Sequence, residues 1–390
     1  MSADVSPFPS SNQRAEAPAA VAAMVRLVRE SFAFVEPRAD EVAAAFYDNL
    51  FHIAPSTRDM FPPGMPIRDS RLLQALVQVV QMVDRPEDLV PYLREIGREH
   101  RKYGLTSDHY EAVGMALIHA VREFAEPVWT EDVERAWAEA YTIMARAMLG
   151  AATEATGPAW WAATVVERER ISWDLAVLRV RPDQPLPYRP GQYVSVEVPQ
   201  CPRLWRYLSP ATAPADDGVL EFHVRTVENG LVSPTIVNDT QVGDVWRIAA
   251  PMGRLTVDRQ SDRDVLMIAG GTGIAPMRSI IEELAQWGLN PRVHLFTGGR
   301  VREDLYDLAH LQNIAASNPW LSILPVLENE PDVREAEHGT LAQVVTKYGS
   351  WSDCDILVSG SPQMIRSTVS ALLLEGAPID HITYDPFILS

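Results

Sequence analysis

Apolar side chains in the first 150 residues recur at intervals of three and four, with polar residues between them. This spacing gives each helix one apolar stripe and predicts a domain made of helices from about residue 20 to 150. Glycine and proline stand mainly at the joints: Gly104 ends one helix, and Thr130 is a possible cap for the last. The stripes comprise Val42, Phe46, Leu50 and Ile53; Leu72, Leu76, Val79 and Val83; Leu89, Leu93, Ile96 and His100; Val113, Leu117, Val121 and Phe124; and Trp137, Tyr141, Met144 and Met148.

The pattern changes after about residue 160 to short apolar runs separated by proline, glycine and aspartate. The first runs indicate an antiparallel barrel, and the regular alternation of strands and helices beyond about 262 indicates a parallel sheet covered by helices. The expected strands are 164–166, 175–180, 193–198 and 220–225, then 265–269, 293–296, 322–327 and 355–359. The predicted fold is therefore multidomain, with an all-α domain, an antiparallel β-barrel and an α/β parallel-sheet domain. The expected divisions are a disordered tail 1–18, a helical domain 19–152, a linker 153–160, a barrel 161–260 and an α/β domain 261–390.

Composition narrows the possible partners. A chain of 390 residues with 47% hydrophobic and 22% charged residues fits about two or three soluble domains. A formal net charge of −18 disfavours nucleic acids and anionic membrane surfaces. Cys201 and Cys354 form no metal-ligand spacing and indicate a reduced, cytoplasmic protein. The chain shows neither a signal peptide nor a bilayer-spanning segment, so we expect small-molecule partners.

A glycine-rich turn after the apolar run 265–269 is the first candidate site. Its sequence is Gly270-Gly271-Thr272-Gly273-Ile274-Ala275-Pro276, and a helical pattern follows from Met277. Glycines let a backbone approach a pyrophosphate, and the helix start offers free N–H groups. The alternative is a helix that merely crosses close to a sheet.

Two further strand ends in this domain carry comparable features. Gly360-Ser361-Pro362 forms a second glycine turn, as required for a ligand lying across the carboxyl edge of a parallel sheet. Arg300 and Arg302 follow a third strand and could face either a ribose phosphate or solvent.

The barrel contains two motifs suited to a flavin dinucleotide. Arg206-Tyr207-Leu208-Ser209 follows a strand, and Gly230-Leu231-Val232-Ser233 opens the helix expected there. An arginine facing a diphosphate, with glycine and serine at a helix start, fits that ligand. An ordinary charged turn and a capped helix explain the same residues.

In the helical domain, His100 lies on an apolar helix face. It is either a core histidine or the axial ligand of a haem, bound through its neutral imidazole. Tyr47 and Tyr110 also lie near apolar faces, where packing explains them equally well.

Together these features resemble a flavohaemoglobin, a globin fused to a ferredoxin-reductase-like module with FAD and NAD(P)H domains. The resemblance covers nearly the whole chain beyond the tail and implies haem b, FAD and NADH or NADPH as cofactors. It rests on Phe46-Tyr47-Asp48-Asn49-Leu50-Phe51, Phe61, Arg98-Glu99-His100, His109-Tyr110, Arg206–Ser209, Gly230–Ser233 and Gly270–Met277.

The resemblance also implies roles for single residues. His100 corresponds to the proximal haem ligand, Tyr110 to the tyrosine near it, Tyr47 to the distal tyrosine that hydrogen-bonds oxygen, and Phe61 to the phenylalanine packed on the haem. The implied flavin contacts are Gln192, Tyr193, Arg206, Tyr207, Leu208, Ser209, Gly230, Leu231, Val232, Ser233 and Phe387. The implied nicotinamide-nucleotide contacts are Gly270, Gly271, Thr272, Gly273, Ile274, Ala275, Pro276, Gly360, Ser361 and Pro362.

Several positions depart from the family pattern around the flavin and on the distal side of the haem. Leu208 stands where the flavin motif usually has tyrosine, and Tyr207 could substitute by a shift of one residue. Arg68 occupies the place of the distal glutamine, and Ser359 precedes a glycine where the family commonly has cysteine.

The proximal side of the haem departs as well. The proximal glutamate falls on Ala152, with Glu154 nearby. Glu99 and Asp385 replace a lysine and a glutamate that can pair in the family, so their attraction would become repulsion if they approached.

The resemblance implies an NAD(P)H oxidoreductase that passes electrons through FAD to haem-bound oxygen, in the manner of a nitric oxide dioxygenase. Its expected partners are oxygen, nitric oxide and NAD(P)H, and its expected state is a monomer or weak dimer. The departures leave two alternatives open. One is a divergent, actinobacterial-type flavohaemoglobin that oxidises D-lactate or another organic donor. The other is an oxygen- or redox-sensing haem protein with a weak reductase half.

Overall fold

The computed structural model describes residues 11–62 and 71–385, with the side chains of 20–62 and 75–385. It divides into two compact units, the first ending at Ala159 and the second beginning at Trp160. Arg68 and Phe387, both expected near a cofactor, lie outside the described residues. None of the helices in the described ranges combines enough length and apolarity to cross a bilayer.

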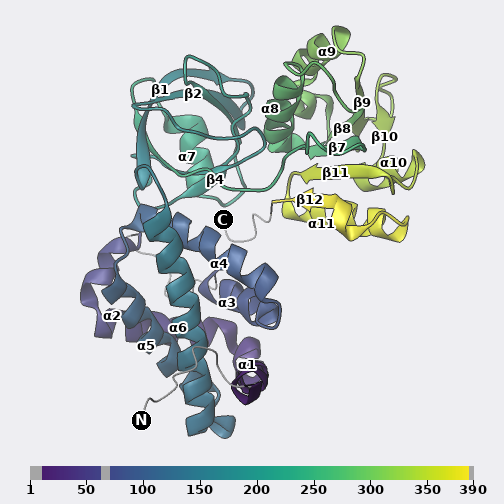
Figure 1. Ribbon diagram of the computed structural model, residues 1–390. Coiled ribbons are helices and arrows are strands. Elements are labelled where there is room, and N and C mark those ends of the chain that lie inside the picture. Colours follow the sequence, from purple (N-terminus) through teal and green to yellow (C-terminus); the bar gives the residue numbers. More distant parts are fainter. Residues whose placement is uncertain (1–10, 63–70, 386–390) are drawn as a thin grey trace, which may run out of the picture. The chain divides into compact units, whose positions relative to one another are not determined.

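The described part of the first unit is helical, as its apolar spacing predicts (Figure 1). Thr130 caps the last helix as expected, since its side chain accepts a hydrogen bond from the Val133 N–H. The helices are α1 (Ser11–Val35), α2 (Ala39–Ile53), α3 (Arg71–Met82), α4 (Pro86–His100), α5 (Ser107–Phe124) and α6 (Glu131–Glu154).

The first helix differs from the expectation. We expected a tail to residue 18, whereas α1 begins at Ser11. Six alanines lie between residues 15 and 23, and alanine favours helices more than any other residue.

Two apolar clusters fill the helical unit. The larger lies among α1, α2, α5 and α6 and includes Phe46, Leu50 and Trp137, each at most 3% exposed. The smaller joins Val79, Leu89 and Leu93 to methionines of α6. The cluster that holds α4 against α6 also fixes the end of α4, where His100 stands.

Helices α4 and α6 cross at close range. A Cβ atom added at Gly97 of α4 would lie 2.2 Å from the backbone oxygen of Met148 on α6. Only glycine permits this approach without displacing backbone. The crossing sets the position of His100, three residues further along α4.

The second unit begins with a six-stranded antiparallel sheet in the order β4-β3-β6-β1-β2-β5. A bridge between Pro210 and Phe222 links the residues after β4 to β5, so the sheet is nearly closed into a barrel. Its core is made of buried valines, Phe222 and Trp246, and helix α7 packs on β5. The elements are β1 (Trp160–Arg170), β2 (Leu175–Pro182), β3 (Val194–Glu197), β4 (Arg206–Leu208), β5 (Leu220–Arg225), α7 (Val232–Asp239) and β6 (Val245–Ala249).

A six-stranded parallel sheet follows in the order β10-β9-β8-β7-β11-β12. Helices cover both faces: residues of α8 share one apolar cluster with α9, and residues of α10 share the other with α11 (Figure 1). The elements are β7 (Asp264–Gly270), α8 (Ile274–Leu284), β8 (Val293–Gly299), α9 (Leu308–Ala316), β9 (Leu321–Leu327), β10 (Glu337–His338), α10 (Leu341–Lys347), β11 (Cys354–Ser359), α11 (Pro362–Leu374) and β12 (Ile382–Tyr384).

Candidate functional site

His100 ends α4 with a ring nitrogen that has no hydrogen-bond partner. Its Nδ1 atom is buried and contacts no donor or acceptor among the described residues. Burial lowers the pKa of His100 to about 4, which the negative charge of Glu99 only partly opposes. The imidazole is therefore neutral near pH 7, the form that ligates a metal.

The charged neighbours of His100 form a pair of their own. Lys102 Nζ lies 2.5 Å from Glu99 Oε1, and the lysine side chain is 2% exposed. Asp385, in the second unit, accepts a hydrogen bond at 3.0 Å from the Arg254 N–H. Glu99 and Asp385 each therefore have a partner within their own unit. The family usually has a lysine directly before His100, and here Lys102, two residues after His100, supplies the positive charge.

Tyr110 on α5 is buried, and its hydroxyl lacks a hydrogen-bond partner among the described residues. Burial raises the pKa of Tyr110 to about 12, so the phenol stays protonated. Glu154, one of two positions considered for the proximal glutamate, instead pairs with Arg94 at the surface. No carboxylate therefore bonds to His100 Nδ1 or to the Tyr110 hydroxyl in the described structure.

An aromatic group forms around Tyr47 on α2. The Tyr47 ring centroid lies 5.5 Å from that of Phe61, 6.0 Å from Phe51 and 5.1 Å from Phe46. Tyr47 is 6% exposed. The structure therefore brings Tyr47 and Phe61 together, as expected for residues on one side of a haem.

The residues of the helical unit fit a haem. A b-type haem needs one neutral imidazole and apolar walls, and His100 and the Tyr47 aromatic group supply these. In the described ranges, no group of three or more His, Cys, Asp or Glu is arranged to hold a metal ion.

In the barrel, β4 carries the candidate flavin residues beside β3. Leu208 pairs with Val194, and Leu208 packs on the barrel core. Tyr207 contacts Tyr193, with ring centroids 4.9 Å apart. Since successive residues of a strand face opposite sides, Tyr207 and Leu208 lie on opposite faces of β4. The substitution by Tyr207, through a one-residue shift, stays a prediction.

A tight turn brings Gln192 beside these tyrosines. Gln192 Oε1 accepts a hydrogen bond at 2.9 Å from the Arg189 N–H. Gly191 has φ +87°, and a Cβ there would lie 2.0 Å from the Leu255 backbone oxygen. Glycine is therefore required at the position that leads into Gln192 and Tyr193.

The turn before α7 is closed by its own serine. Ser233 Oγ accepts a hydrogen bond at 2.9 Å from the Val227 N–H, and its hydroxyl proton can still be donated. Leu231 is 69% exposed, whereas Val232 is buried and anchors the helix. The turn from Gly230 to Ser233 is thus held at both ends, by the Ser233 hydroxyl and by the buried Val232 side chain.

The two glycine turns of the parallel sheet lie side by side. Strands β7 and β11 are adjacent, with Ala269 opposite Ser359. A Cβ at Gly273 would lie 2.4 Å from the Ser359 oxygen, and a Cβ at Gly360 would lie 3.3 Å from the Gly270 backbone. Two glycine-rich strand ends therefore meet at one edge, as their sequence order predicts.

Helix α8 begins earlier than its sequence pattern indicates. It starts at Ile274, directly after the short 3-10 turn Gly271–Gly273, rather than at Met277. Pro276 lies within its first turn, where a missing N–H costs no hydrogen bond. In the second turn, Ser361 Oγ accepts a hydrogen bond from the Met364 N–H and caps α11, and Pro362 is the first residue of that helix. In the first glycine turn, Thr272 lies within the 3-10 segment, and Ile274 and Ala275 are the first two residues of α8. Ile274 and Ala275 are buried.

Arg300 and Arg302 follow β8 and are exposed. Their backbone N–H groups donate to Asp304 and Glu330, at 2.8 and 2.6 Å. Their side chains remain candidates for a nucleotide phosphate.

Comparison with known proteins assigns each part of the chain to a domain family. Residues 44–148 match the globin family, residues 162–257 the oxidoreductase FAD-binding domain, and residues 267–370 the oxidoreductase NAD-binding domain.

Relatives from several bacteria extend this assignment over nearly the whole chain. A flavohemoprotein of Bacillus subtilis (strain 168) is 23% identical over 384 residues, which cover 93% of this chain and 96% of that protein. A flavohemoprotein of Chromobacterium violaceum is 27% identical, with the same coverage of both chains. The reductase part is also 30% identical to the ferredoxin–NAD(P)(+) reductase component of a Pseudomonas putida naphthalene 1,2-dioxygenase system, over 57% of this chain and 68% of that protein.

A solved structure shares the fold over the same extent. The flavohemoglobin of Malassezia yamatoensis, with bound FAD and heme, superposes with a TM-score of 0.78 at 18% identity, covering 93% of this chain and 98% of that one. The globin, FAD-binding and NAD-binding domains imply haem, FAD and a nicotinamide nucleotide as cofactors. The chain belongs to the flavohaemoglobin family, in which a globin is joined to FAD-binding and NAD-binding reductase domains.

Proposed function

We propose that the chain takes electrons from NAD(P)H, passes them through FAD to haem, and uses them with oxygen to convert nitric oxide to nitrate. The observation that carries the proposal is the combination, in one chain, of a globin with a buried neutral histidine and a reductase with two adjoining glycine turns. When bound, FAD divides a hydride into single electrons and haem supplies the oxygen chemistry.

At the nucleotide-binding end, the two glycine turns after β7 and β11 offer a backbone surface with few side chains, which we call the nucleotide cradle. Gly270, Gly271 and Gly273 leave the carboxyl edge of β7 open, and the N-terminal N–H groups of α8 favour an anion there. Gly360 and Ser361 extend the same edge over β11. These residues would hold the nucleotide pyrophosphate and its neighbours.

At the flavin end, a charged side chain and a helix start would bind the second diphosphate. Arg206 lies in β4, and the turn from Gly230 to Ser233 leads into α7. Tyr193 and Tyr207 supply aromatic surface next to them. Leu208, which faces the barrel core, would contribute apolar contact and no hydrogen bond.

In the globin, His100 would be the proximal ligand. Tyr47 would donate its hydroxyl proton on the distal side, where Phe61 would exclude water. Lys102 and Glu99 neutralise one another beside the ligand and so keep an uncompensated charge away from it.

An anaerobic optical titration tests the electron path. We expect the purified protein to show a haem band with flavin shoulders, and NADH or NADPH to bleach the flavin and give ferrous haem. Nitric oxide should then disappear only when both NAD(P)H and oxygen are present. Flavin bleaching by D-lactate without NAD(P)H would contradict the proposed donor.

Replacing the proximal ligand tests the haem site. His100→Ala should abolish haem retention and leave flavin bound, because the two sites belong to different units. The measurement is the ratio of haem to flavin after purification, and unchanged haem content would reject His100 as the ligand. Conversion of His119, an exposed histidine of α5 in the same unit, to alanine is the matched control.

One observation favours a second function. Since no carboxylate bonds to His100 Nδ1 among the described residues, the imidazole donates less electron density to a bound iron. Weak donation suits reversible oxygen binding or sensing better than oxygen activation. Slow haem reduction by both NADH and NADPH, with stable oxygen binding, would support this function.

A further inference from the structure

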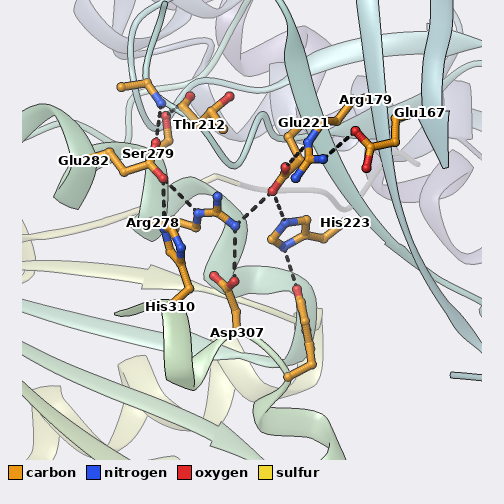
Figure 2. Close-up of polar contacts among 12 residues, drawn as sticks. Glu167, Arg179, Thr212, Glu221, His223, Arg278, Ser279, Glu282, Asp307 and His310 are labelled. Atoms are coloured by element: carbon orange, nitrogen blue, oxygen red, sulfur yellow. Dashed lines mark hydrogen bonds and ion pairs between the residues drawn. The ribbon is translucent and has the colours of Figure 1, made fainter. Parts of the chain in front are cut away.

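A buried group of charged side chains joins the flavin barrel to the nucleotide-binding sheet. Figure 2 shows Glu221 and His223 of β5 facing Arg278 of α8 and Asp307, which follows the 3-10 turn Arg302–Leu305. All four are buried, with exposures between 3% and 9%. Glu221 and His223 lie in a strand that the sequence pattern predicts, but the pattern does not predict their burial.

Arg278 is the centre of this group. Its Nη1 atom lies 2.9 Å from Glu221 Oε1 and 3.1 Å from Asp307 Oδ1, and its Nε atom lies 2.9 Å from Glu282 Oε1. One guanidinium thus ties three segments together: a barrel strand, its own helix and the residues after β8. A planar arginine can do this because its donors point outward in a fixed fork.

Separating the charges around Arg278 would cost a large free energy, because the groups are buried. Its three carboxylates carry more charge than one arginine balances, and Arg179 and His223 supply further hydrogen bonds to Glu221, at 2.7 and 3.0 Å. Removing Arg278 would leave two buried carboxylates without their main cation. Such a loss costs far more than breaking a surface pair.

Further hydrogen bonds join the barrel to the parallel-sheet domain beside Arg278, and we call this whole set of contacts the seam. His223 Nδ1 lies 2.8 Å from the Tyr306 hydroxyl. Ser279 Oγ donates to the Thr212 oxygen at 2.6 Å, and Glu282 accepts from the Ala213 N–H at 3.0 Å. These contacts all join the barrel to α8 or to the segment after β8. They add to the ion pairs by which Arg278 joins the same segments.

The seam lies close to the proposed nucleotide cradle. Arg278 stands one helical turn after Ile274, about 6 Å along the axis of α8. The glycine turn Gly271–Gly273 runs directly into Ile274 and packs against Ser359 of β11, so the turn is joined both to α8 and to the sheet edge. The contacts of Arg278 therefore determine where the nucleotide cradle stands relative to the barrel.

We infer that Arg278 is a positioning residue for hydride transfer, which holds the nicotinamide-binding turn in register with the flavin barrel through Glu221 and Asp307. The inference rests on the proposed transfer from NAD(P)H to FAD. Hydride moves only between closely approached carbon and nitrogen atoms, so a small displacement of α8 lowers the rate more than it lowers nucleotide affinity.

The test uses the full-length protein loaded with haem and FAD. Arg278→Met removes the charge with similar length, and Arg278→Lys keeps the charge but not the fork. Arg263→Met is the matched control, because Arg263 also binds a carboxylate, Asp355 at 2.8 Å, but lies at the other end of β7 and is 45% exposed. Anaerobic stopped-flow mixing with NADH, and separately with NADPH, gives the limiting rate of flavin bleaching and the apparent Kd.

We expect the limiting rate of Arg278→Met to fall by about tenfold or more, with a much smaller change in apparent Kd. The long-wavelength charge-transfer absorption of nucleotide stacked on flavin should weaken in parallel. Arg278→Lys should recover part of both signals, and Arg263→Met should match the wild type. FAD content should be unchanged in all three variants.

Equal rates for wild type and Arg278→Met would overturn the inference, as would equal losses in Arg278→Met and Arg263→Met. Loss of FAD from both Arg278 variants would also overturn it, because the arginine would then support the barrel itself. Failure of the wild type to bleach with either nucleotide is a different result, which rejects the proposed function.

A double-variant cycle identifies the partner. Glu221→Gln should slow flavin bleaching by the same path, and the double variant with Arg278→Met should be little slower than the slower single variant. Multiplicative losses would show that the two residues act independently and would contradict the bridge between them.

Discussion

At the residue scale, the proximal side of the globin is marked by polar atoms without partners. His100 Nδ1 and the Tyr110 hydroxyl are both buried and unbonded in the described structure, whereas nearby Tyr141 donates to the Tyr110 backbone oxygen at 2.5 Å. An unpaired buried hydroxyl contributes a desolvation penalty and no compensating bond. Tyr110 is therefore held in place by its ring and not by its hydroxyl.

Conversion of Tyr110 to phenylalanine tests this difference. We expect Tyr110→Phe to leave the free energy of unfolding unchanged or to raise it by up to about 1 kcal/mol, and Tyr141→Phe to lower it by about 1 kcal/mol. Urea denaturation followed by helical circular dichroism measures both variants. A large loss in Tyr110→Phe, or a shift of its haem spectrum, would reveal a hydroxyl partner in the loaded protein.

Glu221 gives a pH dependence with a defined direction. Burial raises the pKa of this carboxyl, but the hydrogen bond from His223 and the charge of Arg278 more than offset it and bring the pKa to about 2, from an ordinary value of 4.5. Its ionic contribution to stability, on the order of 3 kcal/mol, is complete above pH 4.5 and is lost as the pH falls toward 2.

The comparison of wild type with Glu221→Gln isolates that contribution. The difference between their free energies of unfolding should be largest above pH 4.5 and should shrink between pH 4.5 and 2. Glu167→Gln, at the exposed end of the same ion-pair chain, should have a small effect because surface pairs contribute little. A constant difference across this range would contradict the assignment.

At the scale of elements, glycine decides how closely two helices or two turns approach. Gly97 lets α4 reach α6, and Gly273 lets the turn after β7 reach β11. In both places the neighbour is backbone, which cannot rotate away as a side chain could. The positions of His100 and of the glycine turn after β7 therefore depend on close contacts between backbone atoms.

Gly97→Ala should push α4 away from α6. We expect a loss of about 1–3 kcal/mol in unfolding free energy and weaker haem retention. Gly150→Ala on α6 has open space around it and should gain up to about 1 kcal/mol from helix propensity. Thermal denaturation and haem content after gel filtration measure the two variants, and equal effects would argue against a close crossing.

Sequence patterns predicted where the helices and strands lie better than they predicted which elements contact one another. The stripe of Val42, Phe46 and Leu50 faces the core of the helical unit, so local periodicity was sufficient there. Strand β1 was expected only at 164–166, yet it runs from Trp160 to Arg170 because β2 and β6 pair along it, which is long-range information. The alternation Leu220-Glu221-Phe222-His223 predicted a strand, in which Glu221 and His223 face away from Leu220 and Phe222.

On the face of β5 that carries Glu221 and His223, Glu221 pairs with Arg278 of α8, a helix from another domain. The meeting of the two glycine turns was predictable, since parallel strands end at the same edge. The partners of Glu221 and His223 were not, because they depend on how two domains pack within one unit. By contrast, the pairing of Glu99 with Lys102 is local, because residues three apart on a helical turn are neighbours.

At the scale of the whole molecule, the chain consists of two compact units that meet at residues 159 and 160. The apolar clusters described for each unit draw their residues from that unit alone. The reductase unit also contains the complete buried charge group of Arg278. Each unit therefore has the interior of an independently folding body.

Separate expression of residues 1–159 and 160–390 should give two folded proteins. We expect the first to bind haem and the second to retain FAD and to reduce a soluble artificial acceptor with NADH or NADPH. Absorption spectra and gel filtration measure folding and cofactor content. A reductase fragment that loses FAD, while the full chain keeps it, would show that the helical unit completes the flavin site.

The central position of β7 has a consequence for biosynthesis. Its first neighbour, β8, follows immediately, but its second, β11, is made only when the ribosome reaches residues 354–359. One edge of β7, whose residues 265–269 are all buried in the folded protein, stays unpaired during that interval, on the order of ten seconds. The nascent reductase is therefore most exposed to misassociation, and to chaperones, while the segment between β8 and β11 is being translated.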